Sequence, residues 1–186
     1  NERFKDEEIE KIINQLEIFT LSDYNINLLT NELEKLYQSF GYNNIEITTN
    51  SINYDNNSAD LYLDFNEGNI TKIKSIIFNG NNNYDDSILL SKIQSKTKSI
   101  TNIFANNNFK LYQINNDILR IKKFYKLEGF KDVKINYYIE YFTNNKVEII
   151  FKIDEGKRYY FSTVNLNYKL DKNESLEKEL NLIINS

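Results

Sequence analysis

The chain has 186 residues, of which 40% are hydrophobic and 14% aromatic, and its formal net charge is −4. This composition is typical of a folded globular protein, and the acidic balance argues against a nucleic-acid partner, because phosphate binding requires a dense basic surface. The sequence contains no Cys and no His, which excludes disulfides, thiolate chemistry and the commonest zinc ligand. It starts at Asn1 and contains no Met, so we expect an internal segment of a longer protein, whose targeting signals lie elsewhere.

Two amphipathic helices are predicted at the start of the chain. The acidic run Asp6-Glu7-Glu8 suits the positive end of a helix dipole. A second helical pattern ends at Gly41, where a helix terminus favours left-handed backbone. The apolar residues of the two patterns, at helical spacing, are Ile9, Ile12, Ile13 and Leu16 in the first and Leu29, Leu33, Leu36, Tyr37 and Phe40 in the second.

A β-hairpin is predicted next, from about Ile45 to Phe65, with its turn at Asp55-Asn56-Asn57. Its second strand alternates apolar and polar residues, which indicates one buried face. The apolar positions are Ala59, Leu61, Leu63 and Phe65. Glu67-Gly68 follows the hairpin.

A strand and two helices are predicted after that. Ile73, Ile76 and Phe78 belong to the strand, and Asn79-Gly80-Asn81 is typical of a tight strand-to-helix turn. Asp85-Asp86-Ser87 begins the first helix. The second helix ends at Gly129 and carries Ile118, Ile121, Phe124 and Tyr125.

Two more strands form a second predicted hairpin, through the turn at residues 143–146. The first strand, Val133–Phe142, places Val133, Ile135, Tyr137, Ile139 and Tyr141 on one face. The second strand carries Val147, Ile149, Phe151 and Ile153 and leads to Glu155-Gly156. Phe161, Val164 and Leu166 then predict another strand, and residues 174–184 another helix.

The same order of elements therefore occurs more than once. KLYQSFGYNNIEI at 35–47 corresponds to KFYKLEGFKDVKI at 123–135, and two glycine pairs lie 88 residues apart (129 − 41 and 156 − 68). The chain start aligns at an offset of 80 instead (Asn1 with Asn81), so the second copy carries eight extra residues, within 97–109. We expect a unit at 1–69 that lacks its first strand, a complete unit at 70–157, and the start of a third at 158–186. We also expect motion at the junctions near 68–70 and 156–158.

This pattern resembles the polypeptide-transport-associated (POTRA) domain family. Three stretches carry the resemblance: IKSIIFNGNNNYDDSIL at 73–89, LRIKKFYKLEGFKDVKI at 119–135 and VEIIFKIDEGKRYYFSTVNL at 147–166. The loop and NNNFKLYQINNDILRIKKFY at 106–125 are similar to alphaproteobacterial-type members. The resemblance implies an α+β fold of tandem β-α-α-β-β units, each with a three-stranded mixed sheet backed by two helices. Gly41, Gly68, Gly80, Gly129 and Gly156 are then structural turns and caps.

The tandem arrangement resembles outer-membrane protein assembly factors of Gram-negative bacteria. That implies a non-catalytic periplasmic scaffold without cofactors, attached to the outer membrane through a membrane barrel further along the same chain. Its partners would be unfolded outer-membrane protein clients and accessory lipoproteins of the assembly complex, not nucleic acid. Two alternatives remain open: the periplasmic arm of a two-partner secretion or organelle import pore, and a structural cell-division interaction module.

The candidate site is an edge strand, because unpaired main-chain N–H and C=O groups are a template for an added peptide strand. In the family the second strand is such an edge, and here it corresponds to Lys134–Phe142. The predicted peptide-binding residues on its outward face are Lys134, Asn136, Tyr138, Glu140 and Phe142. Two alternatives stay open: Tyr138 and Phe142 pack on a neighbouring repeat, or Lys134 and Glu140 discourage edge pairing. We expect proline at Asn136 or Tyr138 to block strand addition.

No catalytic constellation is predicted. The sequence has no phosphate-binding glycine loop, no His-bearing triad and no metal-ligand cluster. Asp60, Asp64 and Glu67 alternate along a strand, as carboxylates on a solvated strand face usually do.

Overall fold

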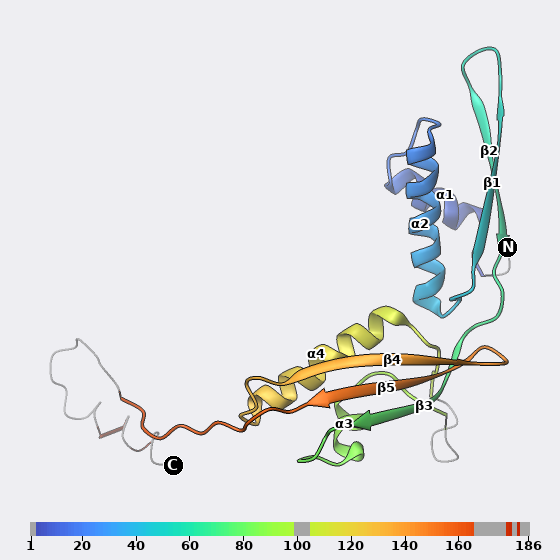
Figure 1. Cartoon of the computed structure of the whole chain (residues 1–186). Helices are drawn as coiled ribbons and strands as arrows, with labels where there is room; N and C mark the ends of the chain where they lie inside the picture. Colours follow the sequence, from blue (N-terminus) through green and yellow to red (C-terminus); the bar gives the residue numbers. More distant parts are fainter. Residues whose placement is uncertain (1–2, 99–104, 166–177, 180–181, 183–186) are drawn as a thin grey trace, which may run out of the picture.

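The computed structural model describes residues 3–98 and 105–165, together with 178, 179 and 182 (Figure 1). The predicted helix at 174–184 lies mostly outside these residues. The elements in chain order are α1 (Asp6–Gln15), α2 (Asp23–Phe40), β1 (Glu46–Asn53), β2 (Ala59–Asn66), β3 (Lys72–Asn79), α3 (Asp86–Lys92), α4 (Leu111–Leu127), β4 (Lys134–Phe142) and β5 (Lys146–Asp154). No described helix is both long enough and apolar enough to cross a membrane.

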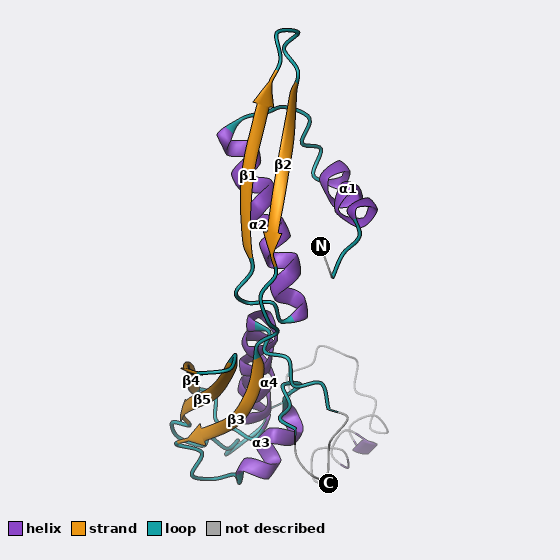
Figure 2. Ribbon diagram, turned by 90° about the vertical axis from the view of Figure 1, so that its right-hand side faces the viewer, coloured by secondary structure: helices purple, strands orange, loops and turns teal. Residues whose placement is uncertain are grey.

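The second half of the chain contains a three-stranded mixed sheet. Its strand order is β3-β5-β4, with β3 parallel and β4 antiparallel to the central strand β5. The strands lie on one side of α4, with α3 close by (Figure 2). Val147, Ile149 and Phe151 of β5 are completely buried beneath the helices. The predicted α+β fold with a mixed sheet backed by two helices is therefore confirmed.

The first half repeats this arrangement with two strands. The antiparallel hairpin of β1 and β2 lies along α2 (Figure 2), and a separate core forms around Leu29, Leu33 and Tyr37. Among the described residues, no strand lies beside β2 at the position that β3 takes beside β5. The division of the chain at 1–69, 70–157 and 158–186 stays a prediction.

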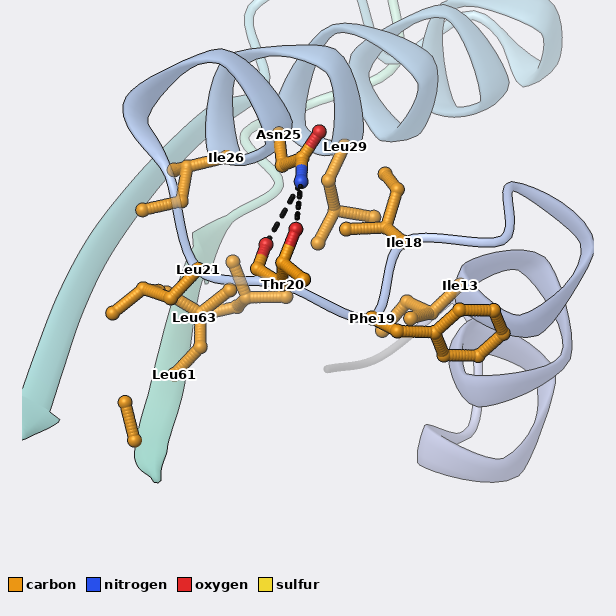
Figure 3. A pocket seen from close by; sticks show the side chains of 11 residues that line it. Ile13, Ile18, Phe19, Thr20, Leu21, Asn25, Ile26, Leu29, Leu61 and Leu63 are labelled. Atoms are coloured by element: carbon orange, nitrogen blue, oxygen red, sulfur yellow. Dashed lines mark hydrogen bonds between the residues drawn. The ribbon is translucent and has the colours of Figure 1, made fainter. Parts of the chain in front are cut away.

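The missing neighbour has a visible consequence for burial. Leu61 and Leu63 of β2 are only partly buried, whereas their repeat equivalents Ile149 and Phe151 are fully buried. Beside Leu61 and Leu63 lies a largely apolar, open pocket of about 250 Å³, which is also lined by residues of α1, α2 and the loop between them (Figure 3). Asn25 holds this loop in place, because its Nδ2 donates to the carbonyl and hydroxyl oxygens of Thr20, at 2.9 and 2.8 Å.

A tyrosine–glutamate pair closes each of the two cores. The Tyr37 hydroxyl donates to Glu67 at 3.0 Å, and the Tyr125 hydroxyl donates to Glu155 at 2.9 Å. Each carboxylate also accepts a main-chain N–H near the start of its unit, from Arg3 or from Asn83, both at 3.1 Å. The repeated Tyr and the repeated Glu-Gly are thus two parts of one contact, which ties the helix to the end of the last strand.

All five glycines have positive φ, at Gly41 (101°), Gly68 (62°), Gly80 (90°), Gly129 (93°) and Gly156 (69°). Gly80 is the most constrained of them, because an added Cβ would collide with the main-chain oxygen of Ile153. A side chain at this turn would therefore be opposed both by the backbone conformation and by the lack of space.

The prediction of a strand beginning near Phe161 is wrong for the residues that the structure describes. Residues 157–165 form no strand, and the side chains of Phe161 and Val164 are 93% and 53% exposed. In the second unit Ile73 pairs with Val147, which lies 74 residues later (147 − 73). A strand needs a neighbour to pair with, and no described strand pairs with residues 157–165.

Candidate functional site

The predicted edge strand is β4, which pairs with β5 alone in the described structure. All five predicted side chains lie on its outward face and are exposed to solvent. They are Lys134, Asn136, Tyr138, Glu140 and Phe142. The structure therefore brings these residues together along one strand, on the face opposite the helices.

The two aromatic rings of this face have cationic neighbours in the same sheet. Tyr138 is 53% and Phe142 40% exposed. The Lys152 ammonium lies 5.1 Å from the Tyr138 ring centroid, and the Lys74 ammonium lies 3.9 Å from the Phe142 ring centroid. Such contacts fix the rings over the sheet while leaving much of each ring open. These ring contacts come from β3 and β5, not from the first unit.

An apolar row crosses the outer face of the sheet at Tyr138. Ile150 of β5 is its register partner, and Ile77 of β3 is the partner of Ile150. Both isoleucines are partly exposed. Sequence reasoning missed this row. The sequence did contain a signal for it. Adjacent isoleucines occur at 76–77 and at 149–150, and strict alternation would place a polar residue at one position of each pair.

The main-chain groups of β4 divide into two sets. The N–H of Lys72 in β3 donates to the carbonyl of Asn145 at 2.8 Å, so odd-numbered residues at this end of β5 direct their main-chain groups toward β3. Even-numbered residues of β5 therefore face β4, because successive residues of a strand alternate in direction.

The β4–β5 register is continuous and pairs even-numbered residues with even-numbered residues. The even-numbered residues of β4 are thus bonded to β5. The main-chain groups that face the open edge belong to Ile135, Tyr137, Ile139 and Tyr141. The predicted five residues supply the outward side chains, but their odd-numbered neighbours supply the free donors and acceptors. A proline at Asn136 or Tyr138 would consequently break the ladder to β5. To remove a donor from the open edge, the proline must instead replace an odd-numbered residue of β4.

The other edge of the sheet, β3, is partly covered by the loop before α4. The Ile73 N–H donates to the carbonyl of Asn107 at 2.7 Å, and Asn107 Nδ2 donates back to the Ile73 carbonyl at 3.1 Å. Lys72 and Asn108 form an isolated β-bridge next to this pair. No comparable hydrogen bond covers the outer edge of β4 in the part of the chain that the structure describes. Of the two edges, β4 is therefore the more open to an added strand.

The comparison with known families bears on the same region. The POTRA family model, described as "Surface antigen variable number repeat", matches residues 71–156. The matched segment runs from just before β3 to just after β5. The predicted resemblance is thereby confirmed, and β4 is the second strand of the matched segment in chain order.

Two curated relatives share the name outer membrane protein assembly factor BamA. The protein of Neorickettsia risticii (strain Illinois) is 28% identical over 137 residues, which cover 72% of this chain and 18% of the relative. That of Buchnera aphidicola subsp. Acyrthosiphon pisum (strain APS) is 28% identical over 169 residues, covering 87% and 27%. The chain thus spans less than a third of either relative.

A solved structure shares the fold. The crystal structure of BamA from Haemophilus ducreyi lacking POTRA domains 1–3 aligns with a TM-score of 0.51 and 14% identity. The match covers 81% of this chain and 27% of that one.

Proposed function

We propose that this chain is part of the periplasmic POTRA region of a BamA-type outer-membrane assembly factor. In this role it is a non-catalytic scaffold that receives unfolded outer-membrane β-barrel proteins, docks accessory lipoproteins and passes clients to a barrel in the same chain. The names of both curated relatives support assembly over a secretion or import pore and over a cell-division module.

The observation that carries the client-binding part is the open edge of β4. Four residues, Ile135, Tyr137, Ile139 and Tyr141, present main-chain groups there, while Tyr138 and Phe142 flank the same edge on the outer face. An extended client segment would extend the ladder with its main chain and lay alternate side chains beside these rings. Main-chain bonds are independent of the client sequence, and rings tolerate varied neighbours, so this edge suits many clients.

The binding should be weak. Each hydrogen bond contributes about 0.5–1.5 kcal/mol net, and association costs about 4 kcal/mol or more in lost freedom. Few bonds form along so short an edge, so the complex would be short-lived, as transfer to a barrel requires.

Amide hydrogen exchange with an added peptide tests this proposal. The probe is a synthetic peptide of about ten alternating apolar and polar residues, the length of a transmembrane barrel strand. Addition should slow exchange at the amides of Tyr137, Ile139 and Tyr141, and leave those of Asn136 and Tyr138, which are already bonded to β5, almost unchanged. Uniform protection along β4, or protection confined to β3, would contradict the assignment.

The matched variants are Tyr141→Pro and Tyr141→Ala. Both remove a ring that is 72% exposed, but only proline removes the donor that faces the open edge. We expect peptide protection to disappear in the proline variant and to persist in the alanine variant, with β5 exchange unchanged in both. Equal loss in the two variants would mean that the ring, not strand addition, holds the peptide.

A further inference from the structure

The loop between α3 and α4 is longer than its counterpart in the first unit. Residues 93–110 separate the end of α3 from the start of α4, whereas residues 16–22 separate α1 from α2. This is the place of the eight extra residues found in the sequence. The end of the loop, residues 105–110, is called the loop end below.

The loop end contacts the end of helix α2 in the preceding unit. Asn108 Nδ2 donates to the carbonyl of Phe40 at 3.0 Å, and Asn43 Nδ2 donates to the carbonyl of Phe109 at 3.1 Å. The last carbonyls of a helix lack partners within the helix, and Asn108 satisfies one of them. Gly41 makes this approach possible, because a Cβ at that position would lie 3.1 Å from the Asn108 Cβ.

The loop end is equally well attached to its own unit. The main-chain carbonyl and the side-chain amide of Asn107 both form hydrogen bonds with the main chain of Ile73. The Phe109 N–H donates to the Thr71 carbonyl at 2.8 Å. Phe109 is only 2% exposed, within the core of the second unit. Lys72 Nζ lies 2.5 Å from Asn108 Oδ1, and burial, with a smaller effect of Lys98, lowers the pKa of this lysine. Because the loop end is fixed in the core of the second unit and hydrogen-bonded to the first, it restricts the orientation of one unit relative to the other.

At the second junction of the chain the helix end has a different partner. Both junctions share one main-chain bond, from Thr71 N–H to the Gly41 carbonyl and from Tyr159 N–H to the Gly129 carbonyl, each at 2.9 Å. The carbonyl equivalent to that of Phe40 belongs to Glu128, and it accepts instead from Arg158 Nε at 2.7 Å. At that junction Arg158, a residue of the linker itself, satisfies the helix end.

We propose that the loop end is an inter-unit clamp, which recognises the end of α2 and holds the first unit at a fixed angle to the second unit. The same segment covers part of the β3 edge, so the clamp also leaves β4 as the open edge and fixes its direction relative to the hairpin of the first unit. This replaces the expectation of free motion at 68–70 with a fixed junction.

Distance measurements between two spin labels test the clamp. The chain has no native Cys, so labels at Asn31→Cys in α2 and Asn116→Cys in α4, both exposed, would be the only ones. The clamp predicts one narrow distance distribution for the otherwise unchanged chain. The double variant Asn43→Ala and Asn108→Ala removes both amides that join the loop end to the first unit and should broaden the distribution severalfold. Asn27→Ala, an exposed change on α2 away from the junction, is the control and should leave it narrow.

Two results would overturn the proposal. One is a broad distribution in the unchanged chain. The other is a narrow distribution that persists in the double variant. Circular dichroism and slow exchange of the β5 amides show whether the variants remain folded. If the double variant unfolds, the single variant Asn43→Ala is the test, because this half-buried residue belongs to neither hydrophobic core, and it must still broaden the distribution.

Discussion

Asp117 offers the sharpest test of how the second unit is held together. It lies in α4 and is completely buried, yet it carries a carboxylate. The carboxylate accepts the N–H of Gln94 at 2.8 Å and that of Ser95 at 2.9 Å, and Arg120 donates to it at 3.0 Å. Asp117 therefore fixes the beginning of the long loop, just after α3, against α4.

Replacement by alanine leaves two main-chain donors without a partner, and Ser95 is only 1% exposed. Hydrogen bonds to a charged group contribute about 1.5–3 kcal/mol each, so Asp117→Ala should cost about 3–6 kcal/mol. Arg120 has a side chain that is 36% exposed. Arg120→Ala removes one partner but leaves both main-chain donors on the carboxylate, so it should cost less than Asp117→Ala and is the matched control.

Native-state hydrogen exchange of the β5 amides measures this cost in the second unit alone. Fully protected amides report the global opening free energy of their unit, which is typically about 5–15 kcal/mol. The reasoning fails if Asp117→Ala lowers this free energy by less than about 1 kcal/mol, or if Arg120→Ala lowers it as much.

Two further predictions use the same assay. Tyr125→Phe removes a buried bond to Glu155 and should cost about 1.5–3 kcal/mol. Burial, followed by the bond to Glu155, raises the pKa of Tyr125. The protonated ring is thus favoured in the folded state, so the stability gap between the native chain and the variant should be constant below pH ~10 and shrink as the pH rises above it; a gap that grows in alkali would contradict this. Gly80→Ala should cost more than Gly156→Ala: both sites have positive φ, worth about 1–2 kcal/mol, but only Gly80 has a main-chain oxygen where the Cβ would be. Equal costs would show that the turn at Gly80 relaxes.

Much of the fold was predictable because its signals are local. Apolar spacing, acidic helix starts and glycine stops depend on the backbone conformation of neighbouring residues, and they placed α2 and its end at Gly41 correctly. The repeat showed that one order of helices and strands along the chain occurs more than once. It also marked Tyr37, Tyr125, Glu67 and Glu155, but only the folded chain shows that each Tyr bonds its Glu.

The candidate site was predictable only in part. Alternation placed Tyr138 and Phe142 on the outward face of their strand, and the family resemblance implied that this strand is an edge. The sequence could not tell which main-chain groups point away from β5, since that depends on the register of β3 against β5. It predicted a strand near Phe161, but a strand also needs a neighbour, and no described strand pairs with residues 157–165.

By itself the sequence determined the elements, their repetition and the face that each side chain occupies, because these depend on contacts within a few residues. Tertiary structure alone decided which edge of the sheet is open. In the sequence Asn107 and Asn108 are part of an ordinary polar run. They form their hydrogen bonds only when folding brings them beside Ile73 and the end of α2. Hydrogen bonds between segments more than thirty residues apart leave no periodic trace in a sequence, so the covering of β3 and the clamp between the units became visible only in three dimensions.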